Sequence, residues 1–117
     1  MAIKSYADNI ILVELPPEPD IRKELDTLME IINAGSGFDV ILDFTHVTIM
    51  TSMALSGFLQ LRKLMEKTGR KLIFCNATSI TKDIFKVTCF DGIFEFIDDK
   101  KEALRTLQSP QHAQTTG

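Results

Sequence analysis

Hydroxyl side chains gather where one helical pattern of this chain begins. Thr51, Ser52 and Ser56 fall within a single short stretch, directly after the predicted loop Thr45–Met50. A hydroxyl at a helix start can cap free backbone N–H groups, which is worth about 1 kcal/mol, and capping alone accounts for Thr51 and Ser52. It can also accept a phosphoryl group, whose charge the helix dipole favours by a few tenths to about 1 kcal/mol. Both kinds of chemistry stay open for these residues.

One carboxylate also stands where other proteins carry out chemistry. Asp43 lies near the end of a predicted strand, where receiver domains of two-component systems carry the aspartate that takes a phosphoryl group. Such domains also need acidic residues after the first strand to hold Mg²⁺, and a lysine that ends the last strand. Here the first of these positions offers only Glu14, and Glu95–Ile97 contains no lysine. The sequence therefore argues against a receiver domain.

The remaining reactive side chains form no recognisable constellation. His46 and His112 have no second ligand at metal-binding spacing, and Gly35-Ser36-Gly37 lacks the spacing of a phosphate-binding loop. Cys75 and Cys89 are not arranged as C-x-x-C, so we expect two buried or half-buried thiols in a reducing compartment. No nucleophile, base and orienting group can be assembled. We predict no catalytic residue, no metal and no cofactor, and hence no enzyme.

The bulk properties exclude two classes of partner. The 117 residues carry a net charge of −3, whereas binding to nucleic acid requires clustered Lys and Arg. The longest apolar run, Ile10–Val13, is far shorter than the roughly 20 residues that span a bilayer, and Met1–Asp8 has no apolar stretch of signal-peptide length. We expect a cytoplasmic protein that binds no nucleic acid and does not insert into a membrane. The densest basic group, interrupted by Glu66, is predicted to be a solvated helix face; it comprises Arg62, Lys63, Lys67, Arg70 and Lys71.

Hydrophobic periodicity predicts strands alternating with helices. The predicted strands are Ile3–Tyr6, Asn9–Leu15, Phe38–Phe44, Lys71–Cys75 and Ile93–Ile97, and the helices are Ile21–Asn33, about Ser52–Thr68, Ser79 to about Val87, and Asp98–Leu107. The first helix has an apolar stripe that should face the core, with Arg22 turned outward; the stripe comprises Ile21, Leu25, Leu28, Met29 and Ile32. In the third helix Ile80, Ile84 and Phe85 should point inward, and the adjacent acids Asp98 and Asp99 fit a helix start.

The order of strands and helices predicts one α/β domain over residues 1–108, with a mixed, mainly parallel sheet of about five strands and about four helices. The strand Phe38–Phe44 is apolar on both faces and should be central, and the opening pair should be antiparallel. The polar residues 109–117 are predicted to be a disordered tail.

Several of these segments together carry a family pattern. Val40–Phe44 is followed by Val47–Leu55 and a helix, then by a Lys-Leu-Ile-Phe-Cys strand, the segment Ile84–Phe94, and Asp98–Leu104. Across almost the whole chain, from Asn9 to Leu107, this order resembles the STAS family, named for sulphate transporters and anti-sigma factor antagonists. The resemblance implies a mixed-sheet α/β domain that acts by binding other proteins.

The resemblance also implies a switch and a place for it. Bacterial members typically sequester an anti-sigma factor kinase and are released when a serine or threonine at the start of the second helix is phosphorylated, in a pattern close to Asp-Ser-Ser/Thr-Gly-Leu. Here Thr51 replaces the aspartate, Met53 stands at the usual acceptor position and Ala54 at the glycine. Methionine cannot be phosphorylated. A constitutive binder and a protein switched through Thr51, Ser52 or Ser56 therefore remain open alternatives.

The resemblance places the binding surface on Thr45–Gly57 and on the neighbouring acidic turn Pro16–Asp20. Met50 and Met53 could be core residues or an adaptable apolar patch for a partner. The predicted partner-binding residues are Glu18, Asp20, His46, Thr48, Met50, Thr51, Ser52, Met53 and Gly57.

Three hypotheses for the function follow. The first is a regulator resembling anti-sigma factor antagonists, whose partner is an anti-sigma factor or serine kinase. The second is a STAS subunit of an ABC-type membrane transport complex, which binds the transporter ATPase without phosphorylation. The third, an enzyme or a flavodoxin-like carrier of a small ligand, needs a polar pocket that the sequence does not display.

Overall fold

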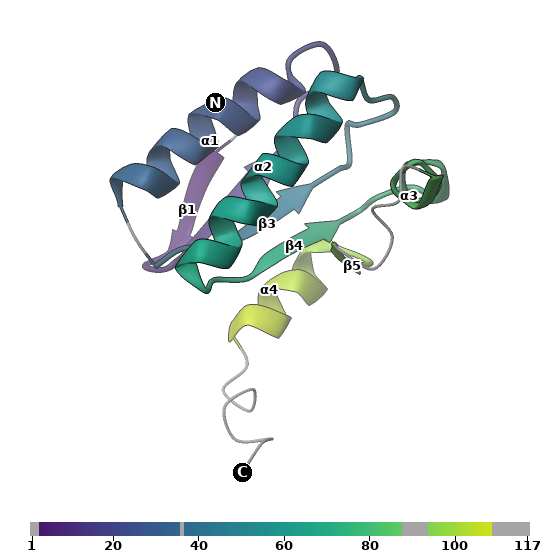
Figure 1. The fold of residues 1–117 in the computed structure, drawn as a ribbon. Helices are drawn as coiled ribbons and strands as arrows, with labels where there is room; N and C mark the ends of the chain where they lie inside the picture. The colour runs from purple at the N-terminus through teal and green to yellow at the C-terminus, as the bar shows by residue number, and fades with distance from the viewer. Residues whose placement is uncertain (1–2, 36, 88–93, 109–117) are drawn as a thin grey trace.

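The computed structural model describes residues 3–35, 37–87 and 94–108, which form one five-stranded sheet and four helices (Figure 1). The strands are β1 (Ile3–Ala7), β2 (Ile10–Glu14), β3 (Asp39–Asp43), β4 (Leu72–Cys75) and β5 (Glu95–Ile97). The helices are α1 (Ile21–Ala34), α2 (Ser52–Thr68), α3 (Ser79–Val87) and α4 (Lys100–Gln108). The predicted fold class is confirmed. Cys89, His112, the start of the predicted last strand at Ile93 and the predicted tail 109–117 lie outside the described residues.

The five strands follow one another across the sheet in chain order. β1 and β2 form the predicted antiparallel pair, and β2, β3, β4 and β5 run parallel. β3 is the middle strand, as its sequence predicted, and Val40, Ile41 and Leu42 are fully buried in it. The carboxyl ends of the parallel strands therefore meet at one edge of the sheet, where the loop between β3 and α2 begins.

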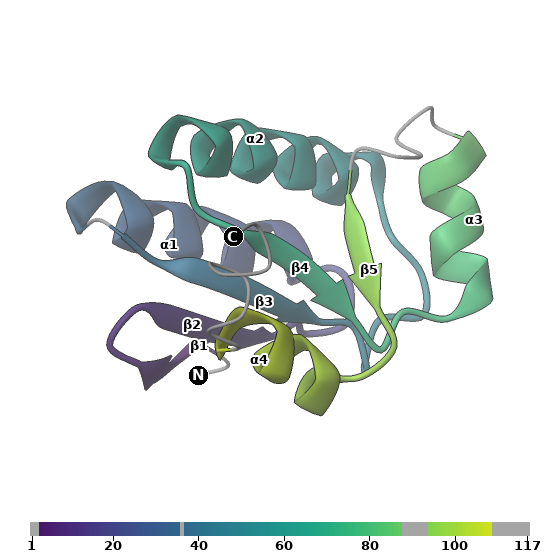
Figure 2. The ribbon, with the colours of Figure 1, turned by 90° about the horizontal axis from the view of Figure 1, so that it is seen from below.

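Helices cover both faces of the sheet. Figure 2 shows α1 and α2 side by side on one face, α4 beneath the other, and α3 at one end of the molecule. The spacing i, i+4, i+7, i+11 of Ile21, Leu25, Leu28 and Ile32 turns one stripe of α1 into the core, and all four side chains are buried. The smaller cluster under α4 is centred on Ala103.

Aromatic rings tie α2 and α3 to the sheet. Phe44, at the end of β3, lies 5.5 Å from Phe58 of α2 and 4.9 Å from Phe74 of β4, measured between ring centroids. Phe85 of α3 lies 5.7 Å from both Phe58 and Phe74. These rings are almost fully buried, so the segment from β3 to α2 begins on a rigid support.

The prediction for α3 was right for Phe85 and wrong for Ile80. Both were predicted to point inward, but Ile80 is 66% exposed, and Thr81 is buried together with Phe85. The Thr78 hydroxyl accepts a hydrogen bond from the Thr81 backbone N–H, which fixes the start of the helix. Residues four apart share one helix face, so Thr81 and Phe85 point inward together and Ile80 faces away.

α4 begins two residues later than predicted. Its first residue is Lys100 and not Asp98, because the Asp99 carboxylate accepts a hydrogen bond of 2.8 Å from the Glu102 backbone N–H. Asp99 is therefore an N-cap that precedes the helix. The acidic pair at Asp98 and Asp99 was correctly attributed to a helix start.

The aromatic cluster gives the first testable prediction. Phe58→Ala removes a fully buried ring that contacts three others, and we expect a loss of about 3–5 kcal/mol in the free energy of unfolding because a cavity is left behind. Met53→Ala, on the same helix but 64% exposed, should change it by less than about 0.5 kcal/mol. Urea unfolding followed by circular dichroism measures both; equal losses would contradict the packing described.

Candidate functional site

The loop between β3 and α2 is anchored at its base and exposed along its length. Phe44 and Val47 are buried, and the Val47 backbone N–H donates to the Phe44 carbonyl at 3.0 Å. His46, Thr48 and Ile49 are exposed around these anchors. The loop is therefore supported at its base and presents these three side chains to solvent.

Thr51 ends the loop and caps α2. Its backbone is extended (φ −88°, ψ 166°), and its hydroxyl oxygen accepts a hydrogen bond of 3.2 Å from the Ala54 backbone N–H. The capping role predicted for Thr51 is confirmed, and Ser52 becomes the first residue of the helix. Ser52 and Ser56 are both exposed, whereas the Thr51 hydroxyl already has a structural partner.

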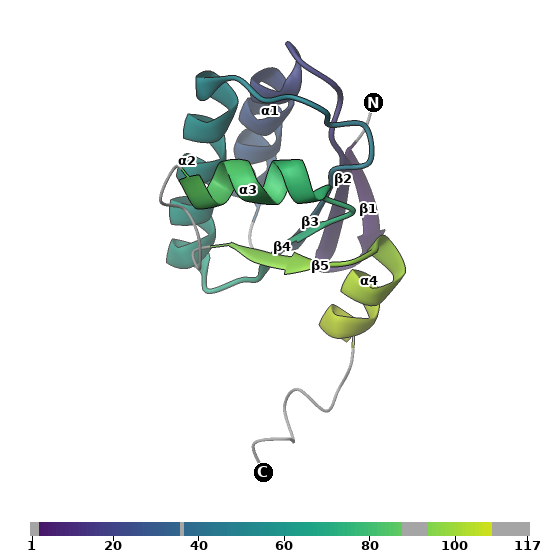
Figure 3. The ribbon, with the colours of Figure 1, turned by 90° about the vertical axis from the view of Figure 1, so that its right-hand side faces the viewer.

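A carboxylate from a distant part of the chain also meets the start of α2. The backbone N–H of Thr51 donates to the Glu18 carboxylate at 2.5 Å. Glu18 belongs to the turn between β2 and α1, and Figure 3 shows this turn next to the loop that enters α2. Two segments predicted separately as partner-binding regions are thus physically joined.

Arg22 makes the second link between these segments, although the sequence placed it on the outer face of α1. Its guanidinium donates to the Met53 carbonyl at 3.1 Å and to the Gln60 side chain at 3.0 Å, and pairs with Asp26 at 3.0 Å. The Arg22 side chain lies across Gly57, where an added Cβ would come within 3.0 Å of its Cδ atom. Gly57 is buried beneath it, so it shapes the surface from below without presenting a side chain.

Met53 lies beside these links and points outward. Its side chain is 64% exposed and that of Ile49 is 66% exposed, whereas Met50 is half-buried against the core. The sequence left open whether Met50 and Met53 pack in the core or face outward. In the structure Met50 packs partly against the core and Met53 faces solvent.

The predicted residues thus fall into one surface with two exceptions. Asp20 precedes α1, is exposed and makes no side-chain capping bond, and Gly57 is buried. We give the name loop–helix surface to the remaining residues together with Ile49, which are exposed except for the half-buried Glu18 and Met50; it comprises Glu18, His46, Thr48, Ile49, Met50, Thr51, Ser52 and Met53. Sequence reasoning missed Ile49 and Arg22. An apolar residue in a polar loop was a usable signal for Ile49, but nothing local distinguished Arg22.

A polar cluster lies beneath the same sheet edge, around Asp43. One oxygen of its carboxylate accepts hydrogen bonds from the Thr45 N–H at 3.0 Å, the Thr45 hydroxyl at 2.6 Å and the Asn76 amide at 2.9 Å. The other oxygen lies 3.9 Å from the Lys100 ammonium, which is 3.4 Å from Glu14. Burial raises the pKa of Asp43, but the hydrogen bonds and Lys100 outweigh it, so its pKa is lower than ordinary.

Asp43 itself is buried in this cluster, whereas the Lys100 and Glu14 side chains reach the surface. Asp43 is 4% exposed and its oxygens are occupied, so it is a poor acceptor for a phosphoryl group, although Lys100 of α4 supplies a lysine that the sequence argument did not foresee. Burial, together with the charge of Asp43, raises the pKa of the Cys75 thiol to about 12. Cys75, buried as predicted, is therefore not a nucleophile at neutral pH.

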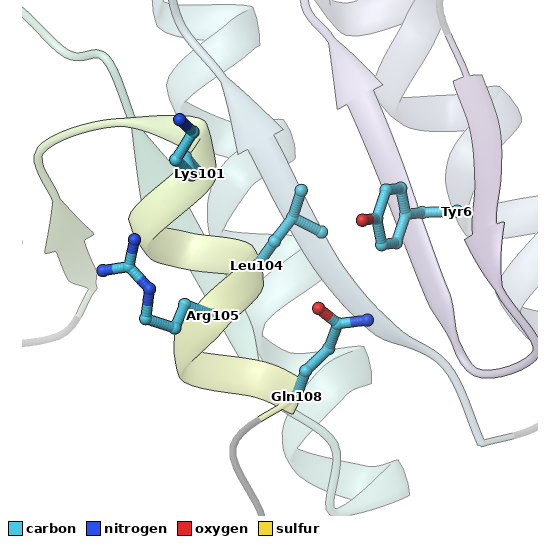
Figure 4. Close-up of a pocket in the computed structure, with 5 residues that line it drawn as sticks. All are labelled: Tyr6, Lys101, Leu104, Arg105 and Gln108. Atoms are coloured by element: carbon cyan, nitrogen blue, oxygen red, sulfur yellow. The ribbon is translucent and has the colours of Figure 1, made fainter.

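A separate hollow of about 390 Å³ lies between β1 and α4. Figure 4 shows Leu104 and Gln108 extending toward the Tyr6 ring, while the Arg105 guanidinium extends along the other flank of α4, where it pairs with Glu102. No titratable pair converges inside it. Within residues 3–35, 37–87 and 94–108, no three His, Cys, Asp or Glu side chains gather as metal ligands, and no helix is long and apolar enough to cross a membrane.

Comparison with known proteins identifies the family. A model of the STAS domain matches residues 21–103. The chain belongs to the STAS domain family. This confirms the resemblance seen in the sequence. No curated protein matches the chain.

Solved STAS structures share the whole fold at low sequence identity. A variant of RsbS from Moorella thermoacetica superposes with a TM-score of 0.80 at 12% identity, covering 94% of this chain and 96% of that one. An anti-sigma-factor antagonist domain protein from Planctomyces limnophilus gives 0.77 at 16%, covering 92% and 98%. The anti-sigma factor antagonist SpoIIAA, in its unphosphorylated form, gives 0.74 at 14%, covering 92% and 96%.

The Thr51 cap leads to the second prediction. Thr51→Ala removes the hydroxyl that accepts from Ala54, and we expect a loss of about 1 kcal/mol in the free energy of unfolding. Thr51→Ser keeps the acceptor and should stay within about 0.5 kcal/mol of the parent. Urea unfolding measures both variants. If alanine and serine behaved alike, the hydroxyl would have no capping role.

Asp43 leads to a prediction about pH. Because folding lowers its pKa, the ionised carboxylate stabilises the fold fully above its ordinary pKa of 3.8, and that contribution is lost as the pH falls through the lower folded value. Asp43→Asn should therefore be less stable than the parent at neutral pH and should lose less stability below about pH 4. Urea unfolding over a pH series measures this, with exposed Asp83→Asn as the control. A parent and Asp43→Asn with parallel acid profiles would contradict the assignment.

Proposed function

We propose that this chain is a non-enzymatic regulatory domain that binds a protein partner through the loop–helix surface, as anti-sigma factor antagonists do. The observation that carries the proposal is Met53, which is 64% exposed on a capped helix start held by one link to α1 and one to the turn before α1. Rigid support matters because a preorganised surface loses less conformational freedom when a partner binds. Covering an exposed methionine in a protein interface stabilises the complex by roughly 1.5–3 kcal/mol.

Family membership supports a protein as the partner. The structures that share this fold include antagonists of anti-sigma factors, and SpoIIAA has been solved in both unphosphorylated and phosphorylated forms. We propose that the partner here is of the same class, an anti-sigma factor or serine kinase, in the cytoplasm. The surface offers two exposed apolar side chains, Ile49 and Met53, and the carboxylate of Glu18 at the start of α2.

The acceptor position favours binding without modification. Met53 stands there and has no hydroxyl, and the Thr51 hydroxyl is occupied by the Ala54 N–H. Ser52 and Ser56 are the hydroxyls left exposed near the helix start. The same observation favours the second candidate, a STAS subunit that binds a transporter ATPase and needs no phosphate. The two candidates share the surface and differ in the partner.

Purification from the native host tests the surface and separates the candidates. The tagged protein should recover an anti-sigma factor or serine kinase, identified by mass spectrometry. Met53→Lys replaces an exposed apolar side chain with a charged one and should reduce the recovered partner at least tenfold, because burying an unpaired charge costs more than about 1.4 kcal/mol. Recovery of ABC-type transporter subunits with the same dependence on Met53 would select the second candidate.

Ile80→Lys is the matched control. Ile80 is exposed to the same degree as Met53, at 66%, but lies on α3 outside the loop–helix surface. The same chemical change there should leave the recovery unchanged. Partners lost equally in both variants, or retained in Met53→Lys, would contradict this surface.

A further inference from the structure

We propose that Glu18 is a fixed anion at the start of α2, and that it holds the loop–helix surface in one state by opposing any further negative charge at Ser52. The biological meaning of this inference rests on the proposed function, since it concerns how that surface is regulated. Its physical basis is the set of contacts that Glu18 and Arg22 make at the start of α2.

Glu18 places its negative charge directly before the first residue of α2. The Glu18 carboxylate accepts the Thr51 backbone N–H at 2.5 Å, directly before the first helical residue. Backbone N–H groups at a helix start carry a partial positive charge and favour an anion. Within the described residues, Glu18 makes no ion pair with Lys or Arg, so its charge is directed at the helix and not at a side chain.

Arg22 binds the start of α2 at a second point. Arg22, from the helix that follows Glu18 in the chain, donates to the Met53 carbonyl in the first turn of α2. Glu18 and Arg22 therefore both bind the start of α2, one through an N–H and the other through a carbonyl. Gly57 leaves room for the Arg22 side chain. If the Glu18 carboxylate moved aside, it would lose its hydrogen bond to the Thr51 N–H.

The charge of Glu18 affects any negative charge that is added at Ser52. A negative charge at the first position of a free helix is favourable by the dipole interaction. Ser52 directly follows the residue that Glu18 binds, so a charge added there meets a like charge as well as the helix start. A phosphoryl group would bring a charge of about −1.5 to −2. Glu18 thus reverses the usual preference, and the surface stays in its unmodified state.

A double-mutant cycle on the purified protein tests the inference. The four proteins are the parent, Ser52→Glu, Glu18→Gln and the double variant; glutamine keeps an acceptor for the Thr51 N–H without the charge. In the parent background, Ser52→Glu should increase the equilibrium constant of unfolding. In the Glu18→Gln background it should decrease that constant by about twofold to fivefold, as an acid at a helix start normally does. Urea unfolding measures all four constants.

Ser56→Glu in both backgrounds is the matched control, because Ser56 is exposed on the same helix one turn further along. Its effect should not depend on Glu18. Amide hydrogen exchange of Thr51 gives a second readout: exchange should be slow in the parent and in Glu18→Gln, and fast in Glu18→Ala. Ser52→Glu with the same effect in both backgrounds, or Thr51 exchange unchanged in Glu18→Ala, would overturn the inference.

The cycle needs no partner, so its failure is distinct from failure of the proposed function. A positive cycle with no Met53-dependent partner would leave the anion at α2 in place and remove the binding role. A negative cycle with a Met53-dependent partner would leave the surface in place and remove Glu18 as its regulator.

Discussion

The close approach of α1 to α2 at Gly57 is the constraint on which the loop–helix surface depends. Because residue 57 has no side chain, Arg22 can lie across α2 and reach the Met53 carbonyl. The turn between β2 and α1 lies alongside the start of α2, where Glu18 binds the Thr51 N–H. Two segments far apart in the sequence thus meet next to a glycine in the interface between the two helices. This close approach also explains why a buried residue belongs to a region that otherwise faces solvent.

The sequence predicted what local patterns determine. The apolar stripe of α1, the central position of β3 and the hydroxyl cap at Thr51 each depend on neighbouring residues, and the structure has all three. The family could be recognised because its pattern is spread over almost the whole chain. The segment Thr45–Gly57 was predicted as the binding surface from that resemblance, and the structure adds that Met53, in the first turn of α2, faces solvent.

Long-range contacts set the limit of that prediction. The bond between Glu18 and Thr51 joins residues far apart in sequence; both were predicted as partner-binding residues, but no local pattern showed that they bind one another. Lys100 reaches Asp43 from the last helix, so a search for a lysine at the end of a strand could not find it. Ile80 was misplaced because its apolar character suggested burial, while the start of α3 is fixed by Thr78. These facts belong to the tertiary structure.

In the proposed function, Met53 stands at the family's usual phosphorylation position and acts as a contact residue, next to the carboxylate of Glu18. A protein partner then covers the loop–helix surface. Hydrogen–deuterium exchange of the purified complex, compared with the free protein, tests whether it does. We expect slower exchange in Thr45–Met53 and no change in α4. Protection confined to α4 or to the β1 edge, with Thr45–Met53 unchanged, would contradict it.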